Sequence, residues 1–268
     1  VQLPSRRVHE AMNPLLRANE EAGKFYRRHL LESEEGADAQ AYLEKRGVSQ
    51  ETSAAFNLGL SPTGWDDMKN YLAGQGFTDG QMIQAGLLHR SDGGRTRDLF
   101  HGRLMFPIKD SEGHIVGFGG RDLDGGQPKY LNTPQSPLFE KSRILWGLDI
   151  AREGIRLTNE AVVVEGYMDA LMAHQNGFTN VVASMGTALT APQVEHLTSL
   201  AKSYVLALDA DAAGQEGARP ERRWRVAAGH GGGRAELGMA DAIRVAGHAE
   251  RWVDRQRAVV RLCDSSRQ

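Results

Sequence analysis

The clearest pattern of hydrophobic and polar positions lies in residues 161–211, where short apolar runs alternate with amphipathic segments. Strands are predicted at AVVVEG, VVASMG and YVLALDAD, and helices at YMDALMAHQNG and TAPQVEHLTSLAKS. Gly177 can end the first helix, and Thr190 and Pro192 suit the start of the second. This alternation predicts a parallel sheet with flanking helices, which is an α/β fold.

The first hundred residues show helical periodicity instead. Asn13 and Pro14 resemble an N-cap followed by a proline in the first turn. Helices are predicted from Asn13 onward, over 39–46, from Ser49 to near Gly59, over 65–72 and over 79–85.

Strands are predicted after residue 103. RLMFPIKD and HIVGFGGRDL read as two strands joined by a tight turn in which Gly113 takes a positive φ. The polar segment 127–148 is predicted as a loop, and it interleaves basic and aromatic residues. This part of the chain is therefore expected to be α+β.

Three acidic residues directly follow two of the strands predicted for the parallel sheet. Glu165 comes after AVVV, and Asp209 and Asp211 come after YVLAL. Because parallel strands present their carboxyl ends at one edge of a sheet, these carboxylates are expected to converge. Crowded carboxylates repel one another unless a cation or shared protons neutralise them, and oxygen ligands without nearby Cys or His favour Mg²⁺, or Mn²⁺ in its place. Such a site suits nucleotidyl transfer.

These acids also have structural explanations. Acidic residues after strands often cap helices, which would account for Asp209 and Asp211. Asp169 lies in the first turn of the helix predicted after Glu165, where it would either stabilise the helix dipole or support the site. The placement of Glu165 directly after an earlier apolar strand favours the metal-binding interpretation.

Composition restricts the class of protein. The 268-residue chain has room for one large domain or two modest ones, and it holds no run of apolar residues long enough to span a membrane. A single cysteine, Cys263, excludes an internal disulfide framework and a cysteine-rich zinc site. These features indicate a cytoplasmic protein. The chain begins at Val1 rather than at Met, so we expect a fragment of a longer protein.

Charge is unevenly distributed. Residues 219–268 hold eleven Arg, no Lys and six acidic residues, whereas residues 1–218 carry a net charge of −7. A nucleic-acid enzyme with this balance would have to confine its basic groups to a local patch.

Residues 39–217 resemble the RNA-polymerase core of bacterial DnaG-type primases. The resemblance is carried by EGYMD with a downstream Asp-x-Asp, and by KYLN and FEK in the same order. It implies a Toprim-type parallel sheet with flanking helices, preceded by an α+β primase core subdomain. It also implies a DNA-directed RNA polymerase that makes short RNA primers on single-stranded DNA from ribonucleoside triphosphates.

The resemblance implies roles for individual residues. Glu165 would be the family's acid/base or metal-adjacent carboxylate, and Asp209 and Asp211 its metal-binding pair. Tyr130 would stack on a base or be a structural tyrosine. Template and nucleotide would be bound by basic and polar side chains of the core subdomain: Lys129, Lys141, Arg103, Arg121, Tyr130 and Asn132.

The chain departs from the family's pattern in three places. No Cys/His cluster precedes residue 100, so the family's upstream zinc module is expected to be absent, and the helicase-binding domain is expected to be absent too. After Gly217 the resemblance stops, and Pro220 would break the helix that the family continues there. A frameshift near codon 217 is our hypothesis, and a genuine basic tail is the alternative.

The expected organisation is a primase core subdomain over 1–157, a truncated Toprim subdomain over 158–218 and an Arg/Gly/Ala-rich tail over 219–268. Two other functions stay open at this point. One is a Toprim nuclease or a topoisomerase-like enzyme, although KYLN argues against it. The other is a catalytically dead nucleic-acid-binding fragment, because a frameshift would remove the family's second acidic motif.

Overall fold

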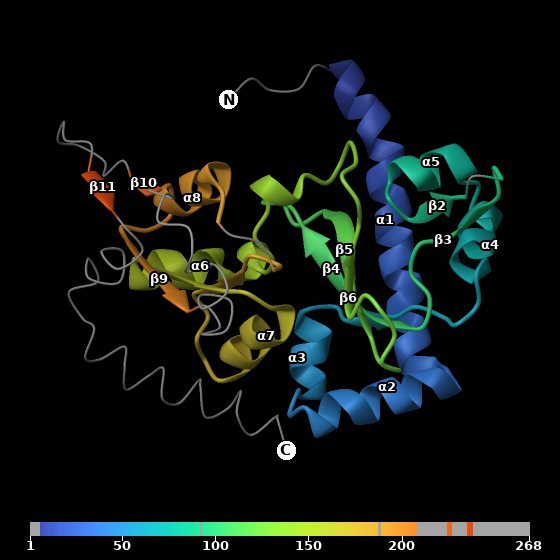
Figure 1. Ribbon diagram of the computed structural model, residues 1–268, viewed down its shortest axis with the longest axis horizontal. Helices are drawn as coiled ribbons and strands as arrows, with labels where there is room; N and C mark the ends of the chain where they lie inside the picture. Colours follow the sequence, from blue (N-terminus) through green and yellow to red (C-terminus); the bar gives the residue numbers. More distant parts are fainter. Residues whose placement is uncertain (1–5, 92, 187–188, 208–223, 227–234, 238–268) are drawn as a thin grey trace. The chain divides into compact units, whose positions relative to one another are not determined.

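The computed structural model, shown in Figure 1, describes residues 6–91, 93–186, 189–207, 224–226 and 235–237. The chain divides into two compact units, of which the first ends at Asp149 and the second begins at Ile150. Helix α6 (Leu148–Thr158) carries the chain from one unit to the other. The boundary predicted between residues 157 and 158 falls at the end of this helix, whereas the units divide near its start.

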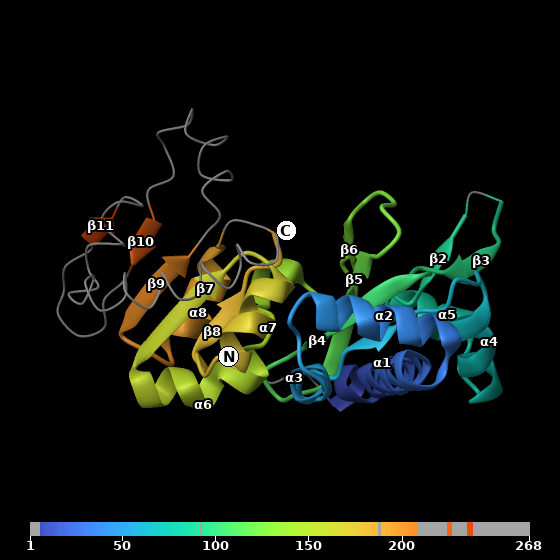
Figure 2. The same ribbon diagram turned by 90° about the horizontal axis from the view of Figure 1, so that it is seen from below.

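The first unit contains a four-stranded antiparallel sheet of order β1-β4-β5-β6. Figure 2 shows helices α1 and α2 on one side of this sheet, and the β5–β6 loop and the β2–β3 hairpin on the other. The strands are β1 (Gly59–Leu60), β2 (Leu88–Arg90), β3 (Thr96–Asp98), β4 (Arg103–Lys109), β5 (Ile115–Asp122) and β6 (Tyr130–Asn132). The helices are α1 (Arg6–Glu32), α2 (Glu34–Lys45), α3 (Gln50–Ala55), α4 (Asp67–Gly74), α5 (Asp79–Gln84) and the 3₁₀ helix η1 (Lys141–Arg143).

Helix α1 packs closely against β5. A Cβ added at Gly23 would lie 2.8 Å from the Cδ1 of Ile115, and the ring of Tyr26 meets that of Phe118 edge to face at 5.4 Å. Its buried side chains recur at helical spacing: Leu15, Ala18, Ala22, Tyr26 and Leu30. The apolar face of α1 therefore packs against one side of the sheet that carries Arg103 and Arg121.

The predicted start of this first helix is wrong. The helix begins at Arg6, and Pro14 lies inside it. Proline removes only one helical hydrogen bond, and a 27-residue helix with an apolar face packed on a sheet retains the others. The proline signal was therefore outweighed by tertiary packing.

The strand pair after residue 103 is confirmed, as is the turn between its strands. β4 and β5 pair antiparallel, and Gly113 has a φ of 91°. The prediction of an uninterrupted loop over 127–148 is wrong, because β6 pairs with β5 there, with Tyr130 opposite Arg121 and Asn132 opposite Gly119. A three-residue polar strand is too short to show an alternating pattern.

The second unit confirms the α/β prediction. Strands β7 (Glu160–Val164), β8 (Val181–Ala183) and β9 (Ser203–Ala207) form a parallel sheet of order β8-β7-β9. Helices α7 (Tyr167–Gln175) and α8 (Ala191–Thr198) connect them, and Thr190 caps α8 in a reciprocal capping box with Gln193. Of the predicted tail, only the antiparallel pair β10 (Trp224–Val226) and β11 (Ala235–Leu237) is described, and the rest of 219–268 lies outside the described residues.

Candidate active site

In the first unit, Arg121 and Tyr130 face each other across β5 and β6. The Arg121 Nη1 donates to the Tyr130 hydroxyl at 2.7 Å, and its guanidinium carbon lies 5.4 Å from the centre of that ring. The same guanidinium lies 5.2 Å from the ring of Tyr42 on α2. Arg121 is only 7% exposed, and the ion pairs found in the described part of the chain do not include it. Aromatic faces, rather than a carboxylate, therefore surround this buried cation.

Arg103 is equally buried but has different partners. Its Nη1 donates to the carbonyl of Pro128 at 2.9 Å and to that of Gly120 at 3.4 Å, and its Nη2 lies 3.9 Å from Asp122. Pro128 belongs to the loop between β5 and β6. The structure thus places Arg103 under this loop, with its donors used by the protein; contact with template or nucleotide stays a prediction.

Lys129 lies at the end of the same loop and is exposed. Its carbonyl accepts from the Asp122 amide at 2.9 Å, and the Asp122 carboxylate accepts from the amide of Gly126. These bonds close the loop at its base and leave the ammonium of Lys129 in solvent. Asn132, on β6, is half-buried.

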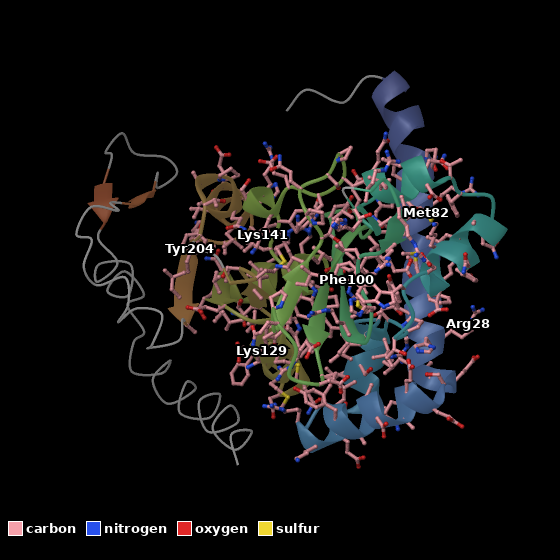
Figure 3. The ribbon with its side chains drawn as sticks, turned by 45° about the vertical axis from the view of Figure 1, so that its right-hand side comes forward. Arg28, Met82, Phe100, Lys129, Lys141 and Tyr204 are labelled. Atoms are coloured by element: carbon pink, nitrogen blue, oxygen red, sulfur yellow. The ribbon has the colours of Figure 1, made fainter. Side chains whose placement is uncertain are left out.

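Lys141 lies in η1, the short 3₁₀ helix that follows β6 in the chain. It is half-buried, and this burial lowers the pKa of its ammonium. Figure 3 shows Lys129 and Lys141 well apart within the first unit, so the predicted basic residues do not form one compact cluster. A ligand that touched both would have to be extended.

In the second unit, Glu165 directly follows β7 at the carboxyl end of the parallel sheet. It is half-buried, and its carbonyl accepts from the Gly186 amide at 3.1 Å, which ties the end of β7 to the segment after β8. Asp169 lies in the first turn of α7, and its Oδ2 would be 2.8 Å from a Cβ added at Gly166. A glycine at the N-cap therefore leaves room for the Asp169 carboxylate near the start of the helix.

Asp209 and Asp211 lie outside the described residues, so their predicted convergence with Glu165 is not observed. The register of the sheet is consistent with it, because Val164 pairs with Ala207 in parallel strands. Glu165 is the next residue after Val164, and Asp209 is the second after Ala207. Within the described ranges no three His, Cys, Asp or Glu side chains form a metal-sized group. The oxygen donors of Glu165 and Asp169 are nevertheless of the kind that Mg²⁺ prefers.

Two residues near Arg121 were missed by the sequence analysis. Tyr42 and Arg46 lie at the end of α2, and the guanidinium of Arg46 is 5.4 Å from the Tyr42 ring. Their sequence context, AYLEKRG, is that of an ordinary amphipathic helix end. Only the packing of α2 beside the sheet reveals that they belong with Arg121.

No helix in the described part of the chain combines the length and apolar character that a bilayer crossing needs.

Comparison with known proteins finds two family models. Residues 25–152 match the model of the DNA primase catalytic core, N-terminal domain, and residues 162–223 match a Toprim-like model. A DNA primase of Deinococcus radiodurans is 46% identical over 216 residues, which are 80% of this chain and 37% of that protein. The chain thus spans little more than a third of this relative's length.

Solved structures give the same result. The RNA polymerase domain of Mycobacterium tuberculosis primase DnaG is 37% identical with a TM-score of 0.70, over 75% of this chain and 68% of that one. A DnaG primase catalytic domain bound to ssDNA is 32% identical with a TM-score of 0.73, over 93% of this chain and 82% of that one.

Proposed function

The chain belongs to the family of bacterial DnaG-type DNA primases, and we propose that it acts as the primer-synthesising core of such an enzyme. In this proposal it joins ribonucleoside triphosphates on a single-stranded DNA template. The two matched family models cover both units, which supports assigning template binding mainly to the first unit and metal chemistry to the second.

The observation that carries the proposal is the environment of Arg121. A buried guanidinium costs free energy unless an anion or hydrogen-bond acceptors compensate its charge. The described residues offer it two aromatic rings and one hydroxyl, and its Nε has no hydrogen-bond partner among them. A phosphate oxygen is a strong acceptor for a guanidinium whose charge is not paired with a carboxylate among the described residues. Arg121 is therefore suited to a backbone phosphate of the template or to a nucleotide phosphate.

The other first-unit residues have complementary roles in this proposal. Lys129 offers an exposed charge at the end of a closed loop, and Tyr130 offers a ring for stacking on a base. Asn132 supplies an amide, and Lys141, whose pKa is lowered by burial, supplies a cation in a less hydrated setting. Arg103 supports the loop from below, through its bonds to Pro128 and Gly120.

Glu165, Asp209 and Asp211 would hold Mg²⁺, or Mn²⁺ in its place, with Asp169 supporting them. The bound ion would neutralise charge on the triphosphate and on the leaving group. In the reaction, the 3′-oxygen of one nucleotide forms a bond to the α-phosphorus of the next, and the bond to the β-phosphate oxygen breaks. Pyrophosphate leaves, and in this proposal Glu165 accepts the hydroxyl proton or orients a metal ligand.

The proposed setting is the bacterial cytoplasm, at a replication fork. The proposed partners are single-stranded DNA and ribonucleoside triphosphates, and we propose no helicase-binding part within residues 1–268. Zinc belongs to the family's upstream module, so we propose no zinc site in residues 1–268.

The test is template-directed synthesis by the full chain, with a single-stranded oligonucleotide, ribonucleoside triphosphates and Mg²⁺ or Mn²⁺. We expect short products that need the metal and that disappear in Glu165→Gln. Glu153→Gln, which removes an exposed carboxylate from α6 in the same unit, is the matched control and should retain them. Binding of the oligonucleotide without any product in the wild-type chain would overturn the synthetic function and favour a binding protein.

A further inference from the structure

The ring of Tyr42 lies beside two guanidinium groups that come from distant parts of the chain. Arg46, one turn further along α2, is 5.4 Å from the ring centre, and Arg121, on β5, is 5.2 Å from it. Arg121 in turn lies 5.4 Å from the ring of Tyr130. Cations and aromatic rings thus alternate from α2 to the edge strand β6. All four residues belong to the first unit.

The arrangement leaves two buried polar atoms without hydrogen bonds, which lowers the stability of the fold. The Tyr42 hydroxyl and the Arg121 Nε are both buried, and neither has a hydrogen-bond partner in the described part of the chain. Buried polar atoms normally find partners, because a lost hydrogen bond to water is otherwise not replaced. Two positive charges near one ring also repel each other. A leucine at position 42 would avoid the orphaned hydroxyl while still covering the sheet.

The side chain of Tyr42 therefore does more than fill space. Its face attracts the Arg121 guanidinium and restricts the directions in which that group can move. The Tyr130 hydroxyl fixes the guanidinium from the other strand, through the bond at 2.7 Å. With both contacts in place, the remaining amino group of Arg121 is held in a fixed orientation before any ligand arrives. Such preorganisation lowers the entropic cost of binding.

We propose that Tyr42 is a positioning residue that orients Arg121 for a phosphate of single-stranded DNA. The inference rests on the proposed function, since it assumes that the first unit binds the template. It assigns Tyr42 no direct contact with the template. It also explains why an aromatic residue stands in a helix whose neighbouring surface positions, Ala41, Glu44 and Lys45, are exposed.

The experiment compares Tyr42→Leu with Tyr42→Phe in the full chain. Binding of a fluorescently labelled single-stranded oligonucleotide is measured by anisotropy over a series of salt concentrations, together with thermal unfolding of each variant. Loss of a cation–π contact predicts that Tyr42→Leu binds about threefold to thirtyfold more weakly. The slope of log K against log salt should fall by about 0.7, as for one lost phosphate contact on a single strand. Tyr42→Phe keeps the ring face and should bind within about twofold of the wild type.

Tyr71→Leu is the matched control. Tyr71 on α4 is also half-buried and also lies under an arginine, with Arg28 at 5.2 Å from its ring, but it is not part of the Tyr42 arrangement. Its affinity and salt slope should match the wild type. If Tyr42→Leu does not fold, Tyr42→Met removes the ring while leaving flexible bulk, and it provides the same comparison.

The outcomes separate the two claims. Wild-type affinity in the folded ring-less variant, or weaker binding with an unchanged salt slope, would overturn the positioning role of Tyr42 and leave the proposed function standing. An equal loss in Tyr71→Leu would also overturn it, because the effect would then be one of general stability. A wild-type chain that binds no single-stranded DNA would overturn the proposed function and this inference together.

Discussion

Replacing Arg103 by methionine distinguishes structural support from direct contact with nucleic acid. The stem of Arg103 lies close to Gly120, since a Cβ added there would be 3.0 Å from the Arg103 Cδ. Methionine keeps most of this stem and removes the guanidinium. From the burial of Arg103 and its bonds to protein carbonyls, we expect the main effect on the stability of the first unit. A residue that bound template directly would show its main effect on affinity.

The size of the effect follows from the contacts. The bond from Arg103 to Pro128, at 2.9 Å, involves a charged donor, and such bonds contribute about 1.5–3 kcal/mol. The bond to Gly120 is long at 3.4 Å, and the separation from Asp122 is 3.9 Å, so each adds little. We expect Arg103→Met to lower the free energy of unfolding by about 3 kcal/mol. Arg103→Lys should lower the free energy of unfolding by less, because it keeps the charge. It should still be less stable than the wild type, since lysine has no planar fork to reach two acceptors.

Urea unfolding followed by tryptophan fluorescence measures this difference. Arg17→Met, which removes an exposed arginine from α1, is the control and should change stability by less than about 0.5 kcal/mol. Amide exchange at Asp122, whose N–H donates to the Lys129 carbonyl, should accelerate in Arg103→Met as the loop loosens. Unchanged stability combined with abolished strand binding would refute the supporting role and restore the direct contact predicted from the sequence.

Three further predictions concern single residues. Burial raises the pKa of Asp98 to about 7, above the unfolded value of about 3.9, so the folded chain retains this proton at pH values where the unfolded chain loses it. The free energy of unfolding should therefore fall as pH rises between about 4 and 7. In Asp98→Asn, urea unfolding at several pH values should no longer show this fall. Trp146→Phe should destabilise by about 1–3 kcal/mol in urea unfolding followed by circular dichroism, because it leaves the Pro107 carbonyl without the indole N–H that donates to it at 2.9 Å. Asp169→Asn should reduce primer synthesis, because Asp169 is proposed to support the metal site. If synthesis is intact and only the melting temperature falls, by a few degrees, the role of Asp169 is to stabilise the dipole of α7.

Much of the second unit could be predicted from the sequence because its signals are local. The runs AVVV and VVA are buried strands, and the Thr190 cap with Gln193 three residues later specifies a helix start. Ser49 likewise caps α3, with its hydroxyl accepting from the Thr52 amide at 3.1 Å. Each of these choices is made within a few residues, so pattern and structure agree.

The features that the sequence did not predict depend on long-range packing. Strand β6 exists because β5 offers it hydrogen bonds, and its own residues, Tyr-Leu-Asn, carry no strand periodicity. Asp98 on β3 accepts from the amides of Met68 and Lys69, so it caps α4 from thirty positions further along the chain. No pattern within α4 specifies such a partner, and the β2–β3 hairpin that carries Asp98 was missed with it.

Arg103 and Arg121 show why residue type alone does not determine a role. The sequence predicts the same role for both, and both are buried to the same extent on neighbouring strands. Arg103 has carbonyl acceptors and Asp122 nearby, so its charge is compensated within the protein. Arg121 has rings and a hydroxyl, and its Nε remains unpaired. Since a buried cation attracts an anion more strongly when the protein compensates it less, Arg121 is the arginine better suited to phosphate. The functional difference between them therefore lies in their acceptors. Substitution of Arg103 should mainly lower stability, and substitution of Arg121 should mainly lower the affinity for nucleic acid.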